Sequence, residues 1–534
     1  MSDLRLAGQE RLRALRQLTA PDAALDMLVV GGGITGAGIA HLAASLGLKV
    51  ALVEQRDYAW GTSSRSSKMV HGGLRYLGSG QFSLTRDAVR EREALMTALP
   101  GLIYPLHYLF PHYRKRFPGP RLFGLLLTVY DWIAGRRNHD FKNPGETLQW
   151  APGLNHQALL GASRFGDAGT DDARLVLRIL QEARALGAIT ANYVRVTSVS
   201  TGPSKQVTLL DEVTGTRHFA FAKVVINATG AWTDQLRTQL GGQREIRPLR
   251  GSHLTVPFWQ LPVSCAVSLF HPQDRRPVFI FPWQGATIIG TTDLDHRHSL
   301  DEEPGITEDE VGYLFALMDH AFPKHQVTRD SVLSSWAGVR PVVSSGDDKA
   351  PSKEKREHAL WDNQGLISIA GGKLTTYRLI AREVLLKAMP YLPELPRPTA
   401  PADFTPAPEQ LDRPVTIPYR TWQRLCGSYG PALENVLQAG ELQVIPGTDT
   451  LWAEVSWAAG QEDVVHLDDL MLRRTRLGLL LPQGGEAVLP ALKDRCSKAL
   501  GWTDNQWQTE IQRYRHIWRQ AYHLPSSTQV SAHG

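Results

Sequence analysis

The first hundred residues open with two short apolar runs that are separated by a helical repeat. Residues 23–30 (AALDMLVV) are the kind of continuous apolar run that forms a buried parallel strand. After the glycine-rich turn GGGITGAG, a helical pattern continues to Leu48, and Lys49–Glu54 (KVALVE) predicts a second strand that ends on an acid. Strand, glycine turn, helix, strand and terminal acid in this order predict a nucleotide-binding βαβ unit.

The marked residues of this unit have separate mechanical roles. Gly31 allows the tight turn, Gly33 lets a pyrophosphate approach the backbone, and Gly36 lets the helix pack close to the strand. Glu54 is expected to accept hydrogen bonds from an adenosine ribose, which disfavours a 2′-phosphate and favours FAD or NAD over NADP. Lys223–Gly230 (KVVINATG) predicts a further strand, either the one that flavoproteins often bring beside the dinucleotide or merely another strand of the sheet.

Three patterns predict elements farther along the chain. Val278–Asp293 has two apolar strands around a Trp-Gln-Gly turn, which is a hairpin signature. Leu366–Ala370 (LISIA) predicts a buried strand, and the Gly-Gly-Lys that follows it begins a helix. Residues 390–414 contain eight prolines, which rule out a helix or a central strand and predict a linker.

Helical periodicity marks both ends of the chain. From Thr421 to Trp518 it predicts a helical domain, in which DDLMLRRTRLGLL (468–480) is expected to form one amphipathic helix. The arginines of that segment, Arg473, Arg474 and Arg476, are expected on a solvated or salt-bridged face, with a role in packing or assembly and none in chemistry. The first twenty residues lack a continuous apolar stretch, so they predict an amphipathic helix packed on the body and no signal peptide.

One region has the character of a membrane-contacting segment. Leu99–Arg137 contains YPLHYLF, HYRKRFPGPR and LFGLLLTVYDWIAGRR, so apolar and aromatic residues stand next to clustered bases. Such a segment suits an interfacial element that enters lipid headgroups without spanning the bilayer. The alternative interpretation is a buried helix with basic flanks.

Composition then narrows the class of protein. The chain of 534 residues is too long for one core, and its 42% hydrophobic and 21% charged residues are ordinary for a globular protein. The net charge of +5 comes without a long Lys/Arg block, so an anionic small molecule or an acidic membrane surface explains it and no motif supports nucleic acid. The three cysteines are far apart, which argues against a disulfide framework or a thiolate metal site. No run approaches the ~20 apolar residues of a spanning helix, and we expect a cytoplasmic protein, peripherally associated with the membrane.

Nine segments, which follow one another along nearly the whole chain, carry a resemblance to a known family. They are GGGITGAGIA (31–40), GTSSRSSKMVHGGLRYL (61–77), DDARLVL (171–177), VVINATGAW (224–232), RGSHL (250–254), FPWQGATIIGTTD (281–293), WAGVRP (336–341), GGKLTTYR (371–378) and DDLMLRRTRLGL (468–479). The chain resembles the FAD-dependent, quinone-linked (aerobic) glycerol-3-phosphate dehydrogenase family, and SKMVHGGLRYL and GGKLTTYR are the most specific segments. The resemblance implies an α/β fold class, with a Rossmann-like FAD-binding domain, an antiparallel-sheet substrate domain and a C-terminal α-helical domain.

This resemblance and the linker together predict a division into domains. The parts are an N-terminal helical extension (1–21), the FAD-binding domain (22–100, continued in about 166–245 and 335–390), the substrate-binding or cap domain with the membrane-contacting segment (101–165 and 246–334), the proline-rich linker (391–418) and the C-terminal helical domain (419–534).

The family's reaction is the oxidation of sn-glycerol 3-phosphate to dihydroxyacetone phosphate by hydride transfer to flavin N5. Its electrons pass to membrane quinone, which the resemblance places at the inner face of the cytoplasmic membrane. An oxidase that reduces oxygen to hydrogen peroxide is the alternative. An amine-oxidising flavoprotein would need a carboxylate clamp, whereas the several cations predicted here suit a phosphate better. A non-catalytic flavin sensor would need no phosphate clamp at all. A homodimer is a further possibility that the sequence leaves open.

Cations and a base are the groups that this reaction requires. The predicted substrate-binding residues are Arg75, Tyr76, Arg340, Arg356 and Lys373, of which Arg356 follows from the resemblance alone and lies in a stretch more basic than the family's pattern. The candidate catalytic residues are His71, His253, Arg75 and Lys373. We expect His71 to contact the flavin and His253 to lie closer to the substrate, and the base stays unassigned.

The cofactor is expected to lie along the glycine turn, the hydroxyl-rich segment and the start of the late helix. Gly72 and Gly73 would let the chain pass flat under a ring system. The predicted cofactor-binding residues are Gly31, Gly33, Gly36, Glu54, Thr62, Ser63, Ser64, Ser67, His71, Gly72, Thr229, Gly230, Gly372, Lys373, Leu374 and Thr375.

Overall fold

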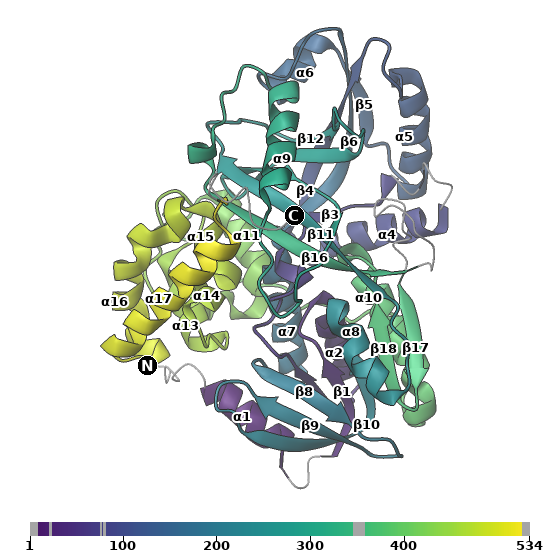
Figure 1. Ribbon diagram of the computed structural model, residues 1–534, viewed down its shortest axis with the longest axis vertical. Coiled ribbons are helices and arrows are strands. Elements are labelled where there is room, and N and C mark those ends of the chain that lie inside the picture. Colours follow the sequence, from purple (N-terminus) through teal and green to yellow (C-terminus); the bar gives the residue numbers. More distant parts are fainter. Residues whose placement is uncertain (1–8, 21–23, 75–76, 78–81, 345–357, 526–534) are drawn as a thin grey trace.

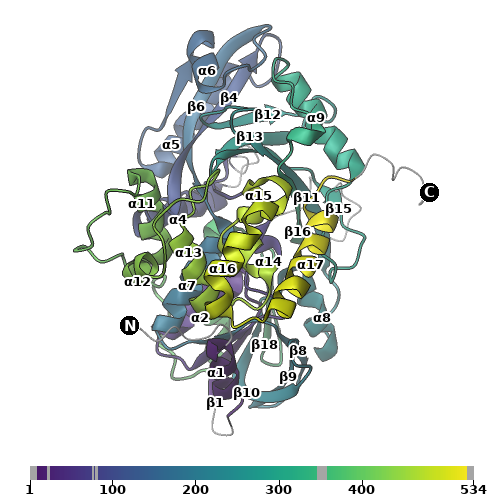
Figure 2. The same cartoon turned by 90° about the vertical axis from the view of Figure 1, so that its left-hand side faces the viewer.

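Two sheets and a group of helices make up the molecule. The computed structural model describes residues 9–20, 24–74, 77, 82–344 and 358–525. The two sheets follow one another along the long axis, and the C-terminal helices lie against one side at the level where the sheets meet (Figure 1). Turned by a quarter, these helices face the viewer and reach toward both sheets (Figure 2).

The first sheet has a parallel centre, as the opening βαβ pattern predicts. Its strands are, in spatial order, β17 (Ala359–Asn363), β18 (Leu366–Ala370), β10 (Arg217–Asn227), β1 (Ala24–Val30), β2 (Val50–Val53) and β7 (Ile189–Ala191), with β9 (Lys205–Asp211) beside β10 and β8 (Val194–Val199) beside β9. β18, β10, β1, β2 and β7 are parallel. The carboxyl ends of these five strands therefore lie at one edge, where doubly wound folds bind their ligands.

Both faces of this sheet are covered, which explains why its central strands are continuously apolar. One face carries a core shared with α2 (Ile34–Ser45), α7 (Asp172–Ala185) and α10 (Tyr377–Ala388). The other face packs against α1 (Gln9–Leu18), strands β8 and β9, and α8 (Thr233–Arg237). The predicted N-terminal helix is therefore present, and it buries Leu15 and Leu18.

The second sheet is mainly antiparallel. In spatial order its strands are β15 (Leu294–Asp295), β11 (Ile246–Pro257), β14 (Ala286–Gly290), β13 (Pro277–Trp283), β12 (Ala266–Phe270), β4 (Ile103–Tyr113), β6 (Leu159–Thr170) and β3 (Met69–Val70), with β16 (Ser334–Val343) beside β11 and β5 (His139–Lys142) beside β6. β13 and β14 confirm the predicted hairpin, whose turn places Gln284 and Gly285 at positive φ. The other helices of the two sheet regions are α4 (Phe82–Ala98), α5 (Pro120–Ala134), α6 (Pro144–Trp150) and α9 (Glu308–Ala321).

The predicted membrane-contacting segment divides into two elements of different character. YPLHYLF belongs to β4, whose residues are largely buried in the second sheet, so an interfacial role for that part was wrong. α5 buries Phe123 and Leu127 on one side, yet Leu122, Leu125 and Trp132 on its other side are 52%, 64% and 82% exposed. Among the described residues, no helix is both long and apolar enough to cross a bilayer.

The C-terminal helices follow a stretch, 392–418, that contains no helix or strand. They are α11 (Tyr419–Tyr429), α12 (Leu433–Gln438), α13 (Trp452–Gln461), α14 (Leu467–Asp469), the π-helix η9 (Leu470–Arg474), α15 (Leu477–Leu480), α16 (Leu489–Leu500) and α17 (Asp504–Ala521). The expectation of one amphipathic helix over 468–480 was wrong, because Arg476 takes the left-handed conformation (φ 60°) and separates η9 from α15. The arginines there are buried and ion-paired, so the solvated alternative was wrong as well.

Candidate active site

Two adjoining cavities lie where the sheets meet. The first has a volume of about 420 Å³ and lies at the carboxyl ends of β1, β2, β10 and β18. The second has a volume of about 670 Å³ and extends along the second sheet. Seven residues line both cavities, namely Thr62, Ser66, Pro341, Gly371, Gly372, Lys373 and Leu374. A ligand held in the first cavity can therefore present one end to the second.

The first cavity has the construction of a dinucleotide cradle. The Glu54 carboxylate accepts hydrogen bonds from the backbone N–H groups of Gly32 (2.6 Å) and Arg56 (2.9 Å). Burial raises the pKa of this carboxyl, although those two N–H groups oppose the rise. The Ser63 hydroxyl accepts from the N–H of Ile34 (2.9 Å) at the start of α2, whose N-terminus faces the cavity and favours an anion.

Gly36 explains how α2 comes so close to β1. A Cβ atom at this position would lie 1.9 Å from the carbonyl oxygen of Gly31, well inside any permitted contact. The helix N-terminus can approach the cavity only because this side chain is absent. Gly36 thus lies behind the cradle and does not line it, as the packing role predicted for it requires.

The polar part of the second cavity centres on Arg340 of β16. Its guanidinium donates to the carboxylate of Asp293 (3.0 Å) and to the hydroxyl of Thr291 (3.2 Å). Lys373 and Arg276 line the same cavity, and the backbone of Asp293 accepts a hydrogen bond from Arg276 (3.0 Å). The cations that line this cavity are Arg65, Arg276, Arg340 and Lys373, and the carboxylates are Asp167 and Asp293.

His253 lies against that polar group from β11. Its Nε2 is 2.9 Å from the Ser67 hydroxyl, and its ring stacks on Trp336 with centroids 5.0 Å apart. Burial, with smaller contributions from Arg340 and Lys68, holds the pKa of His253 well below its usual value, so the ring is neutral at neutral pH. A buried neutral imidazole next to a hydroxyl is able to accept a proton.

The other part of the second cavity is apolar. Phe110 stacks on Phe123 of α5 with centroids 4.3 Å apart, and Phe270 meets Phe110 edge-on at 5.6 Å. The remaining apolar or aromatic side chains that line the cavity are those of Met69, Leu74, Tyr108, Leu126, Phe165, Pro277, Phe279, Pro341 and Val342. Because Phe123 and Leu126 belong to the inner side of α5, this part of the cavity ends directly beneath the helix whose outer side is exposed and apolar.

The predicted site residues fall into four groups. Those that line the first cavity are Gly31, Gly33, Glu54, Thr62, Ser63, Thr229, Gly230, Gly372, Lys373 and Leu374. Those that line the second are Thr62, Ser67, His71, His253, Arg340, Gly372, Lys373, Leu374 and Thr375. Gly36, Ser64 and Gly72 line neither. Arg75, Tyr76 and Arg356 lie outside the described residues.

The prediction that Gly36, Ser64 and Gly72 bind the cofactor requires a correction, because none of the three lines either cavity. The Ser64 side chain is buried, and the carbonyl oxygen of this residue accepts hydrogen bonds from Lys68 (3.1 Å) and Arg476 (3.3 Å). At Gly72 a Cβ atom would lie 2.1 Å from the Tyr130 hydroxyl, so the absence of a side chain serves packing there. It is Gly73, with φ 77°, that lines the cavity.

Sequence reasoning missed several lining residues. Arg276 lies in the turn PQDRRP, which has the composition of an exposed loop, and Asp293 ends the segment in which the pattern predicts only a hairpin. The phenylalanines of the apolar part come from separate strands and a helix, so no local pattern marks them as one group.

Comparison with known proteins agrees with this geometry. A family model described as FAD dependent oxidoreductase matches residues 26–382, and one described as C-terminal domain of alpha-glycerophosphate oxidase matches 399–507. Glycerol-3-phosphate dehydrogenase 2 of Mycobacterium tuberculosis is 33% identical over 92% of this chain and 87% of its own. The chain belongs to the FAD-dependent glycerol-3-phosphate dehydrogenase family.

Two further members of the family extend this result. The aerobic glycerol-3-phosphate dehydrogenase of Bacillus subtilis is 36% identical over 72% of this chain and 70% of its own. The solved glycerol-3-phosphate dehydrogenase of Bacillus halodurans, complexed with FAD, has a TM-score of 0.74 at 29% identity and covers 96% of this chain and 98% of its own.

FAD is therefore the cofactor, and the residues of the first cavity fit it. The N-terminus of α2 and the hydroxyls of Thr62 and Ser63 suit the pyrophosphate, and Glu54 suits the ribose. The residues shared by the two cavities, among them Gly372 and Lys373, are those that would hold the flavin ring. When bound, FAD supplies a two-electron acceptor for a hydride.

Proposed function

We propose that the protein oxidises sn-glycerol 3-phosphate to dihydroxyacetone phosphate and passes the electrons to a membrane quinone. The observation that carries this proposal is the second cavity, which shares seven lining residues with the FAD cradle and has a cationic part and an apolar part. A phosphorylated alcohol suits the first part and a quinone ring suits the second. The names of the relatives support the substrate.

The cationic part is proposed to bind the phosphate. The planar fork of Arg340 matches phosphate oxygens, and Lys373 and Arg276 add charge from neighbouring elements. The Asp293 carboxylate orients Arg340 by accepting a hydrogen bond from its guanidinium. Its negative charge also repels an anion that lies near the carboxylate without contacting the guanidinium. An amine substrate would meet an excess of positive charge here, which disfavours the amine-oxidising alternative.

His253 is proposed to hold the proton that leaves the substrate hydroxyl. Ser67 and His253 both line the cavity, and the Ser67 hydroxyl, 2.9 Å from His253 Nε2, can pass the proton to that nitrogen. The substrate loses its O–H proton through Ser67 to Nε2, and its C–H hydrogen leaves as the hydride. The low pKa of His253 keeps the ring neutral before the reaction, and the tautomer with its hydrogen on Nδ1 can accept the proton at Nε2.

A quinone is favoured over oxygen by the surroundings of α5. Oxygen needs no apolar channel, whereas a quinone has to enter from the lipid phase. The exposed residues Leu122, Leu125 and Trp132 are accompanied by the exposed bases Arg116 and Arg121, a combination that suits an anionic membrane surface. The apolar part of the cavity lies directly beneath this surface.

The substrate assignment is tested by titrating the purified flavoprotein with sn-glycerol 3-phosphate in the absence of oxygen. Bleaching of the flavin absorption by this compound, with none by glycerol or glycine at the same concentration, is the expected result. Reduction by glycine would point to amine oxidation, and a flavin that no compound reduces would point to a sensor. Either result would overturn the assignment.

Membrane contact is tested with the double variant Leu125→Ser, Trp132→Ser. It is expected to lose binding to vesicles that contain anionic lipid, while its flavin is still reduced by substrate at the wild-type rate. The matched control is Phe219→Ser, Phe221→Ser, which removes two apolar side chains that are 50% and 43% exposed on β10. Equal binding by both variants would remove α5 from the membrane contact.

A further inference from the structure

Three arginines of the C-terminal helices are turned toward the FAD-binding region. Successive residues of an α-helix point about 100° apart, but the π-helix η9 and the left-handed Arg476 bring Arg473, Arg474 and Arg476 to one side. Their side chains are nearly inaccessible to solvent, at 1%, 0% and 2% exposure. A buried guanidinium needs partners for its charge, and all three have them in segments several hundred residues away.

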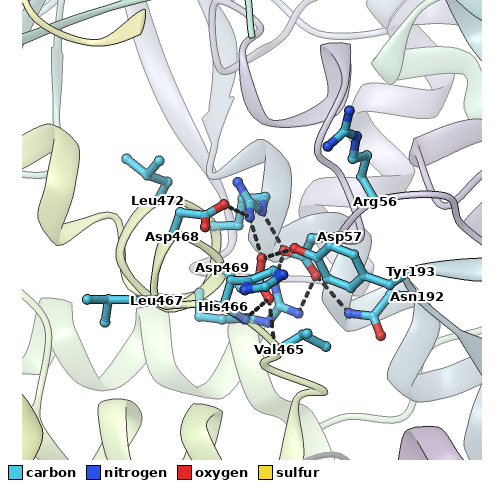
Figure 3. A network of polar contacts seen from close by, with 12 residues as sticks. Arg56, Asp57, Asn192, Tyr193, Val465, His466, Leu467, Asp468, Asp469 and Leu472 are labelled. Atoms are coloured by element: carbon cyan, nitrogen blue, oxygen red, sulfur yellow. Dashed lines mark hydrogen bonds and ion pairs between the residues drawn. The ribbon is translucent and has the colours of Figure 1, made fainter. Parts of the chain in front are cut away.

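Asp57 is the partner that the first two arginines share, and Arg473 also pairs with Asp468 (2.8 Å) and Asp469 (2.5 Å) within the C-terminal helices. The Asp57 carboxylate receives two hydrogen bonds from Arg474 (2.6 and 2.7 Å) and one each from Arg473 (2.5 Å) and Asn192 (3.1 Å). Figure 3 shows Asp57 pointing into this polar network, close to Asp469 and Tyr193. Burial opposes the charge, but Arg474 and Arg473 outweigh it and lower the pKa of Asp57.

The segment that contains Asp57 forms one wall of the FAD cradle. Glu54, Gln55 and Trp60 line the first cavity. The turn is closed by a hydrogen bond from the N–H of Trp60 to the carbonyl of Asp57 (3.0 Å), and Ala59 donates to the carbonyl of Gly32 (3.0 Å) in the glycine turn. Asp57 itself touches neither cavity, so it can act on FAD only through the position of this wall.

Arg476 fastens a second wall of the cradle in the same way. It pairs with Asp172 and with Asp171 (2.8 Å), and it donates to the carbonyl of Ser64 (3.3 Å). Asp172 in turn accepts from the N–H (2.9 Å) and hydroxyl (2.7 Å) of Ser66, which lines both cavities. The two walls are thus tied to one short segment of the C-terminal helices.

We propose that Arg473, Arg474 and Arg476 form a clamp that positions the two walls of the FAD cradle, so that the C-terminal helices set the affinity for FAD. They are positioning residues, because their side chains bind the walls and not the cofactor. If the three arginines served packing alone, their buried side chains would still need ion-pair partners. Those partners would not all have to lie in the segments that form the FAD cradle.

The test compares two isosteric changes of buried carboxylates. Asp57→Asn replaces the carboxylate that pairs with Arg473 and Arg474 by a neutral amide of the same shape. Glu454→Gln is the matched control: Glu454 is 4% exposed and pairs with both terminal nitrogens of Arg424 (2.7 and 2.6 Å), with both residues in the C-terminal helices. FAD is removed from each variant, and the Kd with which the apoprotein binds FAD again is measured by quenching of flavin fluorescence. The melting temperature of each apoprotein is measured as well.

The clamp predicts that Asp57→Asn raises the Kd for FAD by roughly 10–100-fold, the range found for groups that orient the direct ligands of metal sites. Glu454→Gln should lower the melting temperature but leave the Kd within about twofold. A Kd that is unchanged in Asp57→Asn, or raised equally in both variants, would overturn the proposal. Arg474→Lys, which keeps the charge and loses the fork, should give an intermediate Kd and serves if Asp57→Asn does not fold. No substrate is needed, so the result is independent of the proposed reaction.

Discussion

Replacing Arg340 by alanine is expected to weaken the binding of glycerol 3-phosphate far more than that of glycerol. The charge-assisted hydrogen bonds to a phosphate are worth roughly 1.5–3 kcal/mol, and each 1.36 kcal/mol is a factor of ten. The KM for glycerol 3-phosphate should therefore rise by about 10- to 150-fold. Glycerol lacks the phosphate, so its slow oxidation should change little.

The structure adds a second effect that distinguishes this site from an isolated arginine. Asp293 is only 8% exposed and lies 3.0 Å from Arg340, so the alanine variant leaves this carboxylate beside the phosphate without the Arg340 guanidinium. Repulsion between the two anions should move the result toward the upper end of the range. The double variant Arg340→Ala, Asp293→Asn should recover part of the affinity, and Arg340→Lys should lie between wild type and alanine.

The assay is the rate of flavin bleaching at graded substrate concentrations in a stopped-flow instrument without oxygen. The ratio of flavin to protein absorbance in each variant shows whether the cradle is still filled. Equal changes for glycerol 3-phosphate and glycerol would remove Arg340 from the phosphate site. A double variant no better than the single one would refute the part assigned to Asp293.

Three further predictions concern the cradle, the base and the pH dependence of folding. Gly36→Ala should yield protein without bound FAD, because its Cβ would overlap the Gly31 carbonyl, whereas Gly124→Ala in α5, with open space around it, should retain the cofactor, as absorbance at purification would show. His253→Asn should slow flavin reduction by about 10²–10⁴-fold, and wild-type reduction should stay constant down to pH 6.5 and fall only below it. The same side chain makes folding pH-dependent, because His253 binds a proton near pH 6.5 in the unfolded chain and only at lower pH in the folded one. The free energy of unfolding should therefore decrease as the pH falls below 6.5, and denaturant titrations should show a smaller decrease in His253→Asn. A steeper loss in that variant would contradict the assignment.

The parts of the fold that sequence reasoning could predict are those in which local pattern and long-range structure agree. The apolar runs that became β1 and β2 are separated by a glycine turn whose geometry has few solutions, so they indicate the parallel sheet directly. The hairpin of β13 and β14 is likewise a local feature, since its turn determines how the strands pair.

The arginines of η9 show where such reasoning fails. A run of charged residues ordinarily lies in solvent, and although Asp468 and Asp469 pair with Arg473 from close by, nothing near the arginines in the sequence indicates their distant partner. Their partner Asp57 lies more than four hundred residues earlier, as the pairing in the folded chain shows. The left-handed conformation at Arg476 is set by tertiary packing as well, since arginine has no intrinsic preference for it.

The apolar part of the second cavity was missed for a related reason. Phe110, Phe165 and Phe270 each alternate with other residues along their own strands, and they meet only when β4, β6 and β12 pair. Local periodicity shows that such residues are buried, but not whether they face a core or a ligand.

The most direct test of the proposed reaction is to supply sn-glycerol 3-phosphate, in air-saturated buffer, to the protein bound to anionic vesicles that contain a quinone. Quinol and hydrogen peroxide are then measured in the same sample. We predict one quinol for each dihydroxyacetone phosphate formed, with little peroxide. One peroxide for each product, with the quinone left oxidised, would contradict the account and identify an oxidase.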